Sequence, residues 1–260
     1  MTDPRIELRL DGPVAVVTIR RPEKLNALDA AMVDAFIPLC RRIERSAARV
    51  VILTGEGGAS FCAGGDIAAW SGLGADAFAR HWLREGHQAF DALARLIQPV
   101  VAVLNGHCLG GGLELAACAD YRIAEQHVTL GLPETGLGIV PGWSGTQRLS
   151  RRFGPQVVRR MALWGEVYPA QAALDLGIVD QIAPQGQGMA AGLALAQRVL
   201  TRSAKATELT KMLINAAEGE EGGRIGEVLA GAIAATSSEL AEGLSAFREK
   251  RKPRFDEDAG

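Results

Sequence analysis

The 260-residue sequence lacks the features that would assign it to a membrane, an oxidising compartment or a nucleic acid. No apolar run approaches the roughly 20 residues that a membrane-spanning helix needs. The formal net charge is −2, so the chain has no excess of basic residues to attract nucleic acid. Residues 1–5 (MTDPR) match neither the apolar core of a signal peptide nor an arginine- and serine-rich transit sequence. We therefore expect a cytoplasmic location and neither a nucleic-acid nor a membrane partner.

The four cysteines, Cys40, Cys62, Cys108 and Cys118, form no Cys-x-x-Cys pair. In a chain of this length their spacing predicts reduced structural thiols, without a disulfide framework or a zinc site. Cys108 stands in a glycine-rich run and could be a nucleophile, but a small side chain packed under a tight turn is the favoured interpretation. The sequence also has no His-Glu-x-x-His motif, so we expect no metal site.

What is present is ordinary for a globular protein, with 48% apolar and 22% charged residues. Apolar runs at residues 14–19, 50–54 and 99–104 alternate with helical stretches. This alternation predicts parallel strands covered on both faces, and hence an α/β fold. Asp29 is predicted to cap a helix that continues to residue 43.

The last third of the sequence has a different character. It is rich in alanine and leucine mixed with charged residues, and it ends in a charged tail at residues 247–258. This composition predicts helices without strands. We predict a core at residues 1–195 and a helical region at residues 196–260, without a long linker between them.

Two glycine-containing turns each follow a predicted strand: FCAGGD at residues 61–66 and NGHCLGGG at residues 105–112. Glycine lets the backbone pass close to a ligand and leaves amides unobstructed, and Asp66 could cap a following helix. If the strands are neighbours, the two turns could each donate one N–H to the same oxygen, each donor being worth on the order of 3 kcal/mol in a transition state. Tight turns with left-handed glycines explain the pattern equally well.

Other uses of these glycines fit less well. The run at residues 105–112 lacks the Gly-Lys-Ser/Thr ending of a P-loop and the Gly-x-Gly-x-x-Gly spacing of a dinucleotide site. Residues 142–145 (GWSG) are not followed by the glycine that a nucleophile elbow has two residues after its serine. Phosphate binding and serine hydrolysis are therefore disfavoured.

Two glutamates each follow a glycine-rich or proline-marked turn: Glu114 closes the glycine-rich run, and Glu134 follows Pro133, twenty residues later. Two carboxyl groups near free amides suit the addition of water to an activated double bond. One carboxyl can activate water, the other can move a proton on carbon, and the amides can hold an oxyanion. From spacing alone, glutamates on helix surfaces remain the alternative.

Six segments, in order and at similar spacing, resemble the enoyl-CoA hydratase/isomerase (crotonase) superfamily over nearly the whole chain. They are RPEKLNAL (21–28), FCAGGDI (61–67), NGHCLGGGLE (105–114), PETGLGIVPGWSGTQRL (133–149), EG (242–243) and FREKR (247–251). The resemblance implies an α/β crotonase-like spiral of ββα units with a C-terminal helical trimerisation region, assembled as a homotrimer or a hexamer of two trimers. It also implies a coenzyme A thioester as substrate and no separate cofactor.

The resemblance further implies a role for each matching residue. The amides of Gly65 and Gly111 would polarise the thioester carbonyl, Glu114 would activate water, Glu134 would exchange a proton at C2, and the Gly142 amide would help to hold the water. Contacts with coenzyme A are implied at Leu25, Ala63, Gly65, Asp66, Ile67, Ala68, Gly111 and Lys250. For Lys250, a solvated helix end is an equal alternative.

Two departures from the family pattern bear on the substrate. Many members have a lysine where this chain has Ala68, which removes one possible contact with coenzyme A. Many hydratases have a small residue where this chain has Trp143, so the indole would narrow or reshape the acyl pocket. Residues 70–90 are expected near the acyl end, but their aromatic side chains are more typical of core packing and receive no role here.

Reversible hydration of a 2-enoyl-CoA to a 3-hydroxyacyl-CoA is the leading hypothesis, because both glutamates are present. The alternatives are enoyl-CoA isomerisation, a dehydratase or lyase reaction on a specialised acyl-CoA, and a non-catalytic acyl-CoA-binding protein. Isomerases commonly dispense with the carboxylate at the position of Glu114. Loss of catalysis is disfavoured because Glu114, Glu134, Gly65 and Gly111 are all intact.

Overall fold

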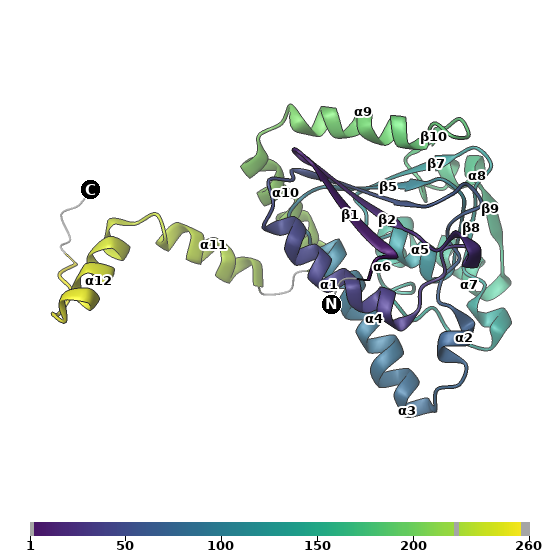
Figure 1. Cartoon of the computed structure of the whole chain (residues 1–260), viewed down its shortest axis with the longest axis horizontal. Coiled ribbons are helices and arrows are strands. Elements are labelled where there is room, and N and C mark those ends of the chain that lie inside the picture. The colour runs from purple at the N-terminus through teal and green to yellow at the C-terminus, as the bar shows by residue number, and fades with distance from the viewer. Residues whose placement is uncertain (1–2, 221–223, 256–260) are drawn as a thin grey trace. The chain divides into compact units, whose positions relative to one another are not determined.

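The computed structural model of the chain describes residues 3–220 and 224–255, which form two compact units that meet between Lys211 and Met212. Two sheets organise the first unit (Figure 1). The larger sheet has the strand order β1 (Ile6–Asp11), β2 (Val14–Ile19), β3 (Val50–Gly55), β5 (Val100–Leu104), β7 (Tyr121–Glu125) and β10 (Gln181–Ala183). The smaller sheet has the order β4 (Ser60–Cys62), β6 (His107–Leu109), β8 (Thr129–Gly131) and β9 (Val167–Pro169).

Most neighbouring strands run parallel. In the larger sheet only β1 is antiparallel to its neighbour, and in the smaller sheet only β9 is. The strands predicted at residues 14–19, 50–54 and 99–104 are β2, β3 and β5, which lie side by side in parallel. The α/β class and the parallel arrangement are therefore confirmed.

Alternating side chains divide the core between the two faces of the larger sheet. Along β3, Val51 and Leu53 belong to the larger buried cluster, whereas Val50 and Ile52 belong to a smaller one on the other face. A strand that is buried on both faces has a nearly uninterrupted apolar sequence, and this is the pattern of β2, β3 and β5.

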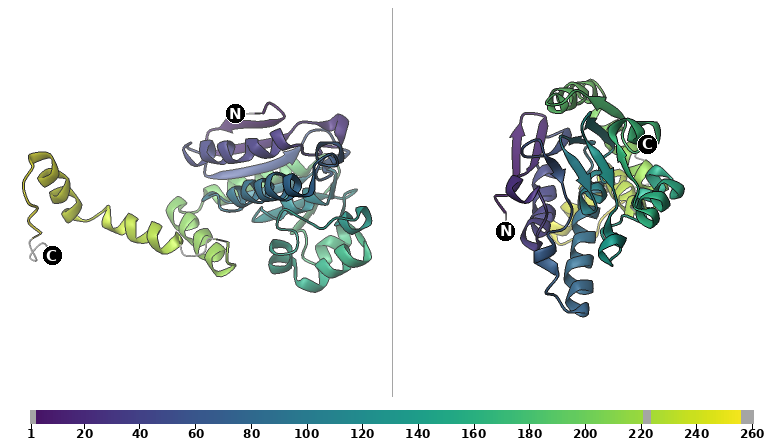
Figure 2. Two further views of the ribbon diagram at one scale, coloured as in Figure 1. Left: turned by 90° about the horizontal axis from the view of Figure 1, so that it is seen from below. Right: turned by 90° about the vertical axis from the view of Figure 1, so that its right-hand side faces the viewer.

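Helices cover both faces of this sheet. The helices α1 (Ala30–Glu44) and α4 (Arg84–Ala94) pack side by side on the larger cluster (Figure 2). Between them, the Phe36 and Phe90 rings meet edge to face with their centroids 6.2 Å apart. The helix α9 (Gly188–Leu200) lies on the opposite face (Figure 1). Asp29 caps α1 as predicted, because its side chain accepts a hydrogen bond from the Met32 amide at 3.1 Å.

Shorter helices connect the strands and form the rim of the first unit. They are η1 (Pro22–Lys24), α2 (Ile67–Trp70), α3 (Ala75–Ala77), the π-helical η2 (Phe78–Leu83), α5 (Gly111–Ala116), η3 (Glu134–Leu137), α6 (Arg148–Phe153), α7 (Pro155–Trp164) and α8 (Ala170–Asp175). The helix α10 (Ala204–Ala217) ends beyond the boundary between the two units.

The second unit contains α11 (Arg224–Ala234) and α12 (Ser238–Glu249), and Ser237 caps α12 by accepting from the Leu240 amide at 3.3 Å. In the described ranges no strand follows β10, in agreement with the helices expected there. Residues 256–258 of the charged tail lie outside the described residues. The trimerising role of this region stays a prediction.

The units part at residue 211, later than the boundary that the sequence predicted after residue 195. The reason is that α9 and the start of α10 are bound to the core. Ala196 is buried in the smaller cluster, and the Lys211 ammonium donates to Asp120 Oδ2 at 2.7 Å and to the Gln98 carbonyl at 2.9 Å.

All four cysteines are free and buried within the first unit. Burial raises the pKa of Cys62 to about 12 and raises that of Cys108 well above its ordinary value. Cys108 is therefore a packed thiol, and the nucleophile alternative is wrong. None of the helices in the described part of the chain is long and apolar enough to cross a bilayer.

Candidate active site

The glycine-rich run forms a tight turn from β6 into α5. Gly110 has φ +54°, a conformation that side chains disfavour, and α5 begins at Gly111. A Cβ on Gly112 would lie 2.0 Å from the Cys62 carbonyl oxygen, so only glycine allows α5 to pack against the end of β4. The turn thereby places Glu114 two residues after Gly112, on the first turn of a buried helix.

The second turn, residues 63–66, lies directly beside the first. Gly64 has φ +99°, and a Cβ on it would lie 3.1 Å from the Gly111 nitrogen. Asp66 accepts from the Ala68 amide at 3.0 Å and so caps α2, as predicted. The two turns thus meet where the chain carries no side chains.

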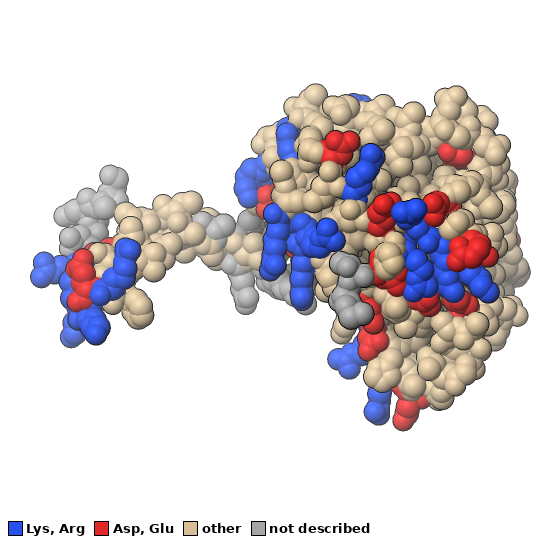
Figure 3. All heavy atoms as spheres, viewed as in Figure 1, with Lys and Arg blue, Asp and Glu red and all other residues tan. Residues whose placement is uncertain are grey.

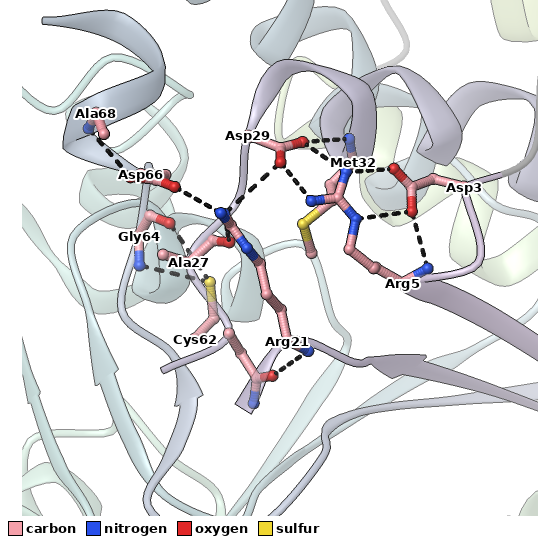
Figure 4. Close-up of polar contacts among 11 residues, drawn as sticks. Asp3, Arg5, Arg21, Ala27, Asp29, Met32, Cys62, Gly64, Asp66 and Ala68 are labelled. Atoms are coloured by element: carbon pink, nitrogen blue, oxygen red, sulfur yellow. Dashed lines mark hydrogen bonds and ion pairs between the residues drawn. The ribbon is translucent and has the colours of Figure 1, made fainter. Parts of the chain in front are cut away.

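An ion-pair network fixes this second turn from outside (Figure 4). The Arg21 guanidinium lies 2.8 Å from Asp66 and 3.7 Å from Asp29, and it donates to the Ala27 carbonyl at 3.1 Å. Arg5 joins the network through Asp29. Because Asp29 also caps α1, the helix start and the glycine turn are held by the same group of charges.

The amides of Gly65 and Gly111 are the free donors of these turns. Neither amide donates to another group in the part of the chain that the structure describes. Gly111 is the first residue of α5, where an amide has no partner inside the helix and the helix dipole favours negative charge. Both glycines line one cavity.

Glu114 is buried and is oriented by the loop that follows η3. Its Oε1 accepts from the Trp143 amide at 2.7 Å and from the Gly145 amide at 2.6 Å. A Cβ on Gly145 would lie 2.5 Å from the same oxygen, so glycine is required for this approach. Burial and the nearby charge of Glu134 raise the pKa of Glu114 to about 8, outweighing the two hydrogen bonds.

Glu134 is also buried but is not held by hydrogen bonds. Neither of its carboxyl oxygens has a partner in another described residue. A Cβ on Gly110 would lie 3.0 Å from Glu134 Oε1, so the carboxyl group lies against the glycine turn. Burial raises the pKa of Glu134 to about 7. A buried carboxyl group without a fixed partner is free to exchange a proton with a ligand.

The cavity between the two glutamates opens from an exposed apolar mouth to a buried inner end. Val140 at the mouth is 64% exposed, whereas Trp143 at the inner end is 3% exposed. The lining residues are Ala63, Gly65, Ile67, Trp70, Phe78, Trp82, Leu83, Gly111, Glu114, Glu134, Leu137, Ile139, Val140, Gly142 and Trp143.

The five residues predicted to be catalytic all line this cavity: Glu114, Glu134, Gly65, Gly111 and Gly142. Of the other residues predicted to contact coenzyme A, Ala63 and Ile67 line it as well. Leu25, Asp66 and Ala68 lie beside it without lining it. Leu25 has φ +53° and accepts from the Ala63 amide at 3.1 Å, which ties it to the glycine turn.

Lys250 belongs to the second unit, where it follows α12 with φ +52°. Basic and acidic side chains are mixed at this end of the chain (Figure 3), and Arg251 pairs with Glu242 at 2.6 Å. The contact of Lys250 with coenzyme A stays a prediction.

Several lining residues had no predicted role, among them Phe78, Trp82 and Leu83 of η2. Their segment is π-helical, so its facing residues do not follow the ordinary helical spacing from which a sequence is read. Gly86 was also missed, although it receives the Trp143 indole. An isolated glycine within a helix was the available signal.

A metal is not suggested by the side chains of this site. Within residues 3–220 and 224–255, no three His, Cys, Asp or Glu side chains are grouped so as to hold a metal ion.

The chain is similar to proteins of the enoyl-CoA hydratase/isomerase family. The enoyl-CoA hydratase/isomerase family model matches residues 9–258. The crotonyl-CoA hydratase of Syntrophomonas wolfei is 34% identical over 256 residues, which cover 96% of this chain and 97% of that protein. The short-chain-enoyl-CoA hydratase of Clostridium acetobutylicum is 37% identical over 209 residues, which cover 80% of each.

A solved structure agrees with these sequences. The enoyl-CoA hydratase from Bacillus anthracis superimposes with a TM-score of 0.80 at 31% identity, over 96% of this chain and 98% of that one. The predicted crotonase-like fold is thereby confirmed. The chain belongs to the enoyl-CoA hydratase/isomerase family.

Proposed function

We propose that the protein catalyses the reversible hydration of a 2-enoyl-CoA thioester to a 3-hydroxyacyl-CoA. The observation that carries this proposal is that two buried carboxyl groups and two free amides line one cavity. The naming of relatives as crotonyl-CoA hydratase and short-chain-enoyl-CoA hydratase supports the same reaction.

The amides of Gly65 and Gly111 bind the thioester oxygen. Attack at C3 of a conjugated thioester moves electron density onto that oxygen, so two preorganised donors stabilise the transition state more than the bound substrate. Each such donor contributes on the order of 3 kcal/mol in a site that excludes water. The helix dipole of α5 adds to the effect at Gly111.

The two glutamates divide the proton transfers. With pKa values raised to about 8 and about 7, the pair holds close to one proton between its members near neutral pH. The step begins from the form of the pair in which Glu114 is ionised and Glu134 is protonated. Because the pKa of Glu114 is the higher of the two, this is the less populated of the two one-proton forms. From it, Glu114 accepts a proton from water as the water oxygen bonds to C3, and Glu134 gives its proton to C2. The proton has then moved from Glu134 to Glu114, and exchange with solvent restores the starting state.

The loop amides explain why Glu114 is assigned to the water. Because its Oε1 is fixed by the Trp143 and Gly145 amides, its other oxygen keeps a constant direction toward the cavity. The Gly142 amide, in the same loop, supplies a further donor for the water. Addition of water and two proton transfers complete the reaction without a change of oxidation state that would need a redox partner, so we propose no cofactor besides the coenzyme A of the substrate.

We also propose that the protein assembles as a homotrimer or as a hexamer of two trimers. Leu240, Leu244 and Phe247 are spaced to lie on one face of α12, and all three are exposed. An apolar helix face is stabilised when another copy of the chain covers it.

The reaction is tested by following the loss of absorbance of the conjugated thioester with crotonyl-CoA and with longer and branched 2-enoyl-CoAs. We expect turnover with at least one of them. Tight binding of these thioesters without turnover of any would contradict the proposal and would favour a non-catalytic acyl-CoA-binding protein.

A further inference from the structure

The largest part of the inner end of the cavity is formed by the side chain of Trp143. Its indole packs against Trp82 at 4.9 Å and against Phe90 at 5.1 Å between ring centroids. The indole N–H donates to the Trp82 carbonyl at 3.0 Å, while the backbone amide donates to Glu114. Both ends of the residue are thus fixed, and the ring has no room to rotate away.

Two glycines on two helices, Gly86 and Gly111, make the space that the indole occupies. A Cβ on Gly86 of α4 would lie 2.0 Å from the indole nitrogen, and one on Gly111 of α5 would lie 2.8 Å from the ring. A Cβ on Gly65 would contact the ring at 3.5 Å. The ring therefore lies beside the two residues that supply the proposed oxyanion donors.

Leu83 completes the closed end. A Cβ on Gly142 would lie 2.4 Å from Leu83 Cδ2, so the leucine packs directly on the loop backbone. Leu83 and Gly142 also line a second cavity, of about 350 Å³, on the side of α4 that carries His87 and Asp91. These two residues therefore lie between the two cavities.

The space left inside the site is small. The cavity between the glutamates measures about 100 Å³, compared with the roughly 300–1,000 Å³ of pockets that enclose a drug-sized ligand. A short acyl group can extend from the oxyanion donors to the indole, whereas a long one has no path beyond it.

We propose that Trp143 and Leu83 form a fixed wall that limits the substrate to short-chain 2-enoyl thioesters. This inference rests on the hydratase function proposed above and adds the substrate class. It makes Trp143 and Leu83 the specificity-determining residues of the site, with Gly86 as the residue that admits the indole.

The experiment compares kcat/KM for straight-chain 2-enoyl-CoAs from four to twelve carbons. For the unchanged protein we expect crotonyl-CoA to exceed decenoyl-CoA at least about tenfold, since even one misfitting methylene in an apolar pocket can cost that much. Trp143→Ala is expected to reduce this ratio by about tenfold or more. Trp164→Ala, a tryptophan that is 72% exposed and outside the cavity, is the matched control and should keep the ratio.

Leu83→Ala provides an independent variant, because it removes the side chain that lies between the two cavities and keeps the buried indole of Trp143. It too should reduce the ratio, and it decides the question if Trp143→Ala does not fold. Equal kcat/KM for crotonyl-CoA and decenoyl-CoA in the unchanged protein would refute the proposed limit on chain length, while the hydratase function would still stand. A ratio unchanged in every folded variant would also refute this limit, whereas no turnover of any thioester would refute the function itself.

Discussion

At the scale of single residues, burial sets the proton affinity of both candidate catalytic carboxyl groups. Glu114 is held by two loop amides, and such donors normally lower the pKa of a carboxyl group, yet loss of water raises it to about 8. Glu134 has no such donors from other residues and reaches about 7 by burial. The two pKa values are close, so a proton can lie on either carboxyl group, as the two proton transfers of a turnover require.

This closeness predicts a bell-shaped dependence of kcat/KM on pH. At low pH both carboxyl groups are protonated and none can activate water, so the rate rises as pH approaches about 7. Above about 8 both are ionised and none can protonate C2, so the rate falls. The two apparent pKa values belong to the pair, and steady-state rates across this range measure them. A profile that is flat through it would contradict the shared proton.

Replacing Glu134 by glutamine keeps the shape of the side chain and removes the proton that C2 requires. We expect kcat to fall by about 10²–10⁴-fold, the usual contribution of a positioned acid or base. Binding of the product thioester, measured by calorimetry, should change little. A nearly normal kcat in Glu134→Gln would refute the role of this residue.

Ser144 is an unusual residue in the loop that orients Glu114, because it has φ +80° without being glycine. Its hydroxyl pairs with His87 Nε2 at 2.8 Å. Ser144→Ala removes the hydrogen bond and keeps the strain, whereas Ser144→Gly removes both. Since a left-handed conformation costs a residue with a Cβ about 1–2 kcal/mol, the glycine variant should be the more stable of the two by about that amount in urea unfolding. Equal stability would show that the backbone is not strained there.

At the scale of elements, the site depends on the close packing of α5 on β4. Gly112→Ala would place a Cβ 2.0 Å from the Cys62 carbonyl, and backbone cannot move aside as a flexible side chain can. We expect a loss of about 1–3 kcal/mol in the free energy of unfolding, as overpacking usually causes. Gly136→Ala is the matched control, because its Cβ would meet no atom within 4 Å. Equal stability of the two variants would contradict the packing argument.

The elements that the sequence predicted best are those set by local chemistry. Strands β2, β3 and β5 are continuous apolar runs, and Asp29 and Asp66 are side chains that cap helices. The short strands β4, β6, β8 and β9 have three residues each and owe their pairing to distant neighbours. No periodic pattern can develop in so few residues, and they were not predicted.

The candidate site was predictable in part for the same reason. A glycine-rich turn and a proline-marked turn drew attention to Glu114 and Glu134 from the residues alone, whereas the family resemblance named Gly65 and Gly111 as the oxyanion donors. The resemblance also predicted that Trp143 would narrow the acyl pocket and that residues 70–90 would lie near its acyl end. The sequence could not show that Trp143, Leu83 and Gly86 meet, because they come together only through tertiary packing of η2 and α4 against the loop.

At the scale of the whole molecule, the proposed assembly depends on the apolar face of α12. Phe247 is 83% exposed, and a glutamate there would place a charge in the centre of the proposed contact. We expect Phe247→Glu to dissociate the trimer or hexamer, as measured by light scattering after size-exclusion chromatography. Glu239→Gln, on the same helix, is the control and should leave the mass unchanged. A monomeric mass for the unchanged protein would refute the assembly.

The four buried thiols can be used to measure local opening of the folded chain. With Cys62 and Cys108 enclosed beneath the glycine turns and their pKa values raised, an alkylating reagent meets no thiolate until that part of the molecule opens. The alkylation rate of each cysteine therefore measures how often the structure around it opens. Cys40, on the buried face of α1, reports on a different region. Comparing the positions would show whether the substrate cavity opens by itself or only when the whole core unfolds.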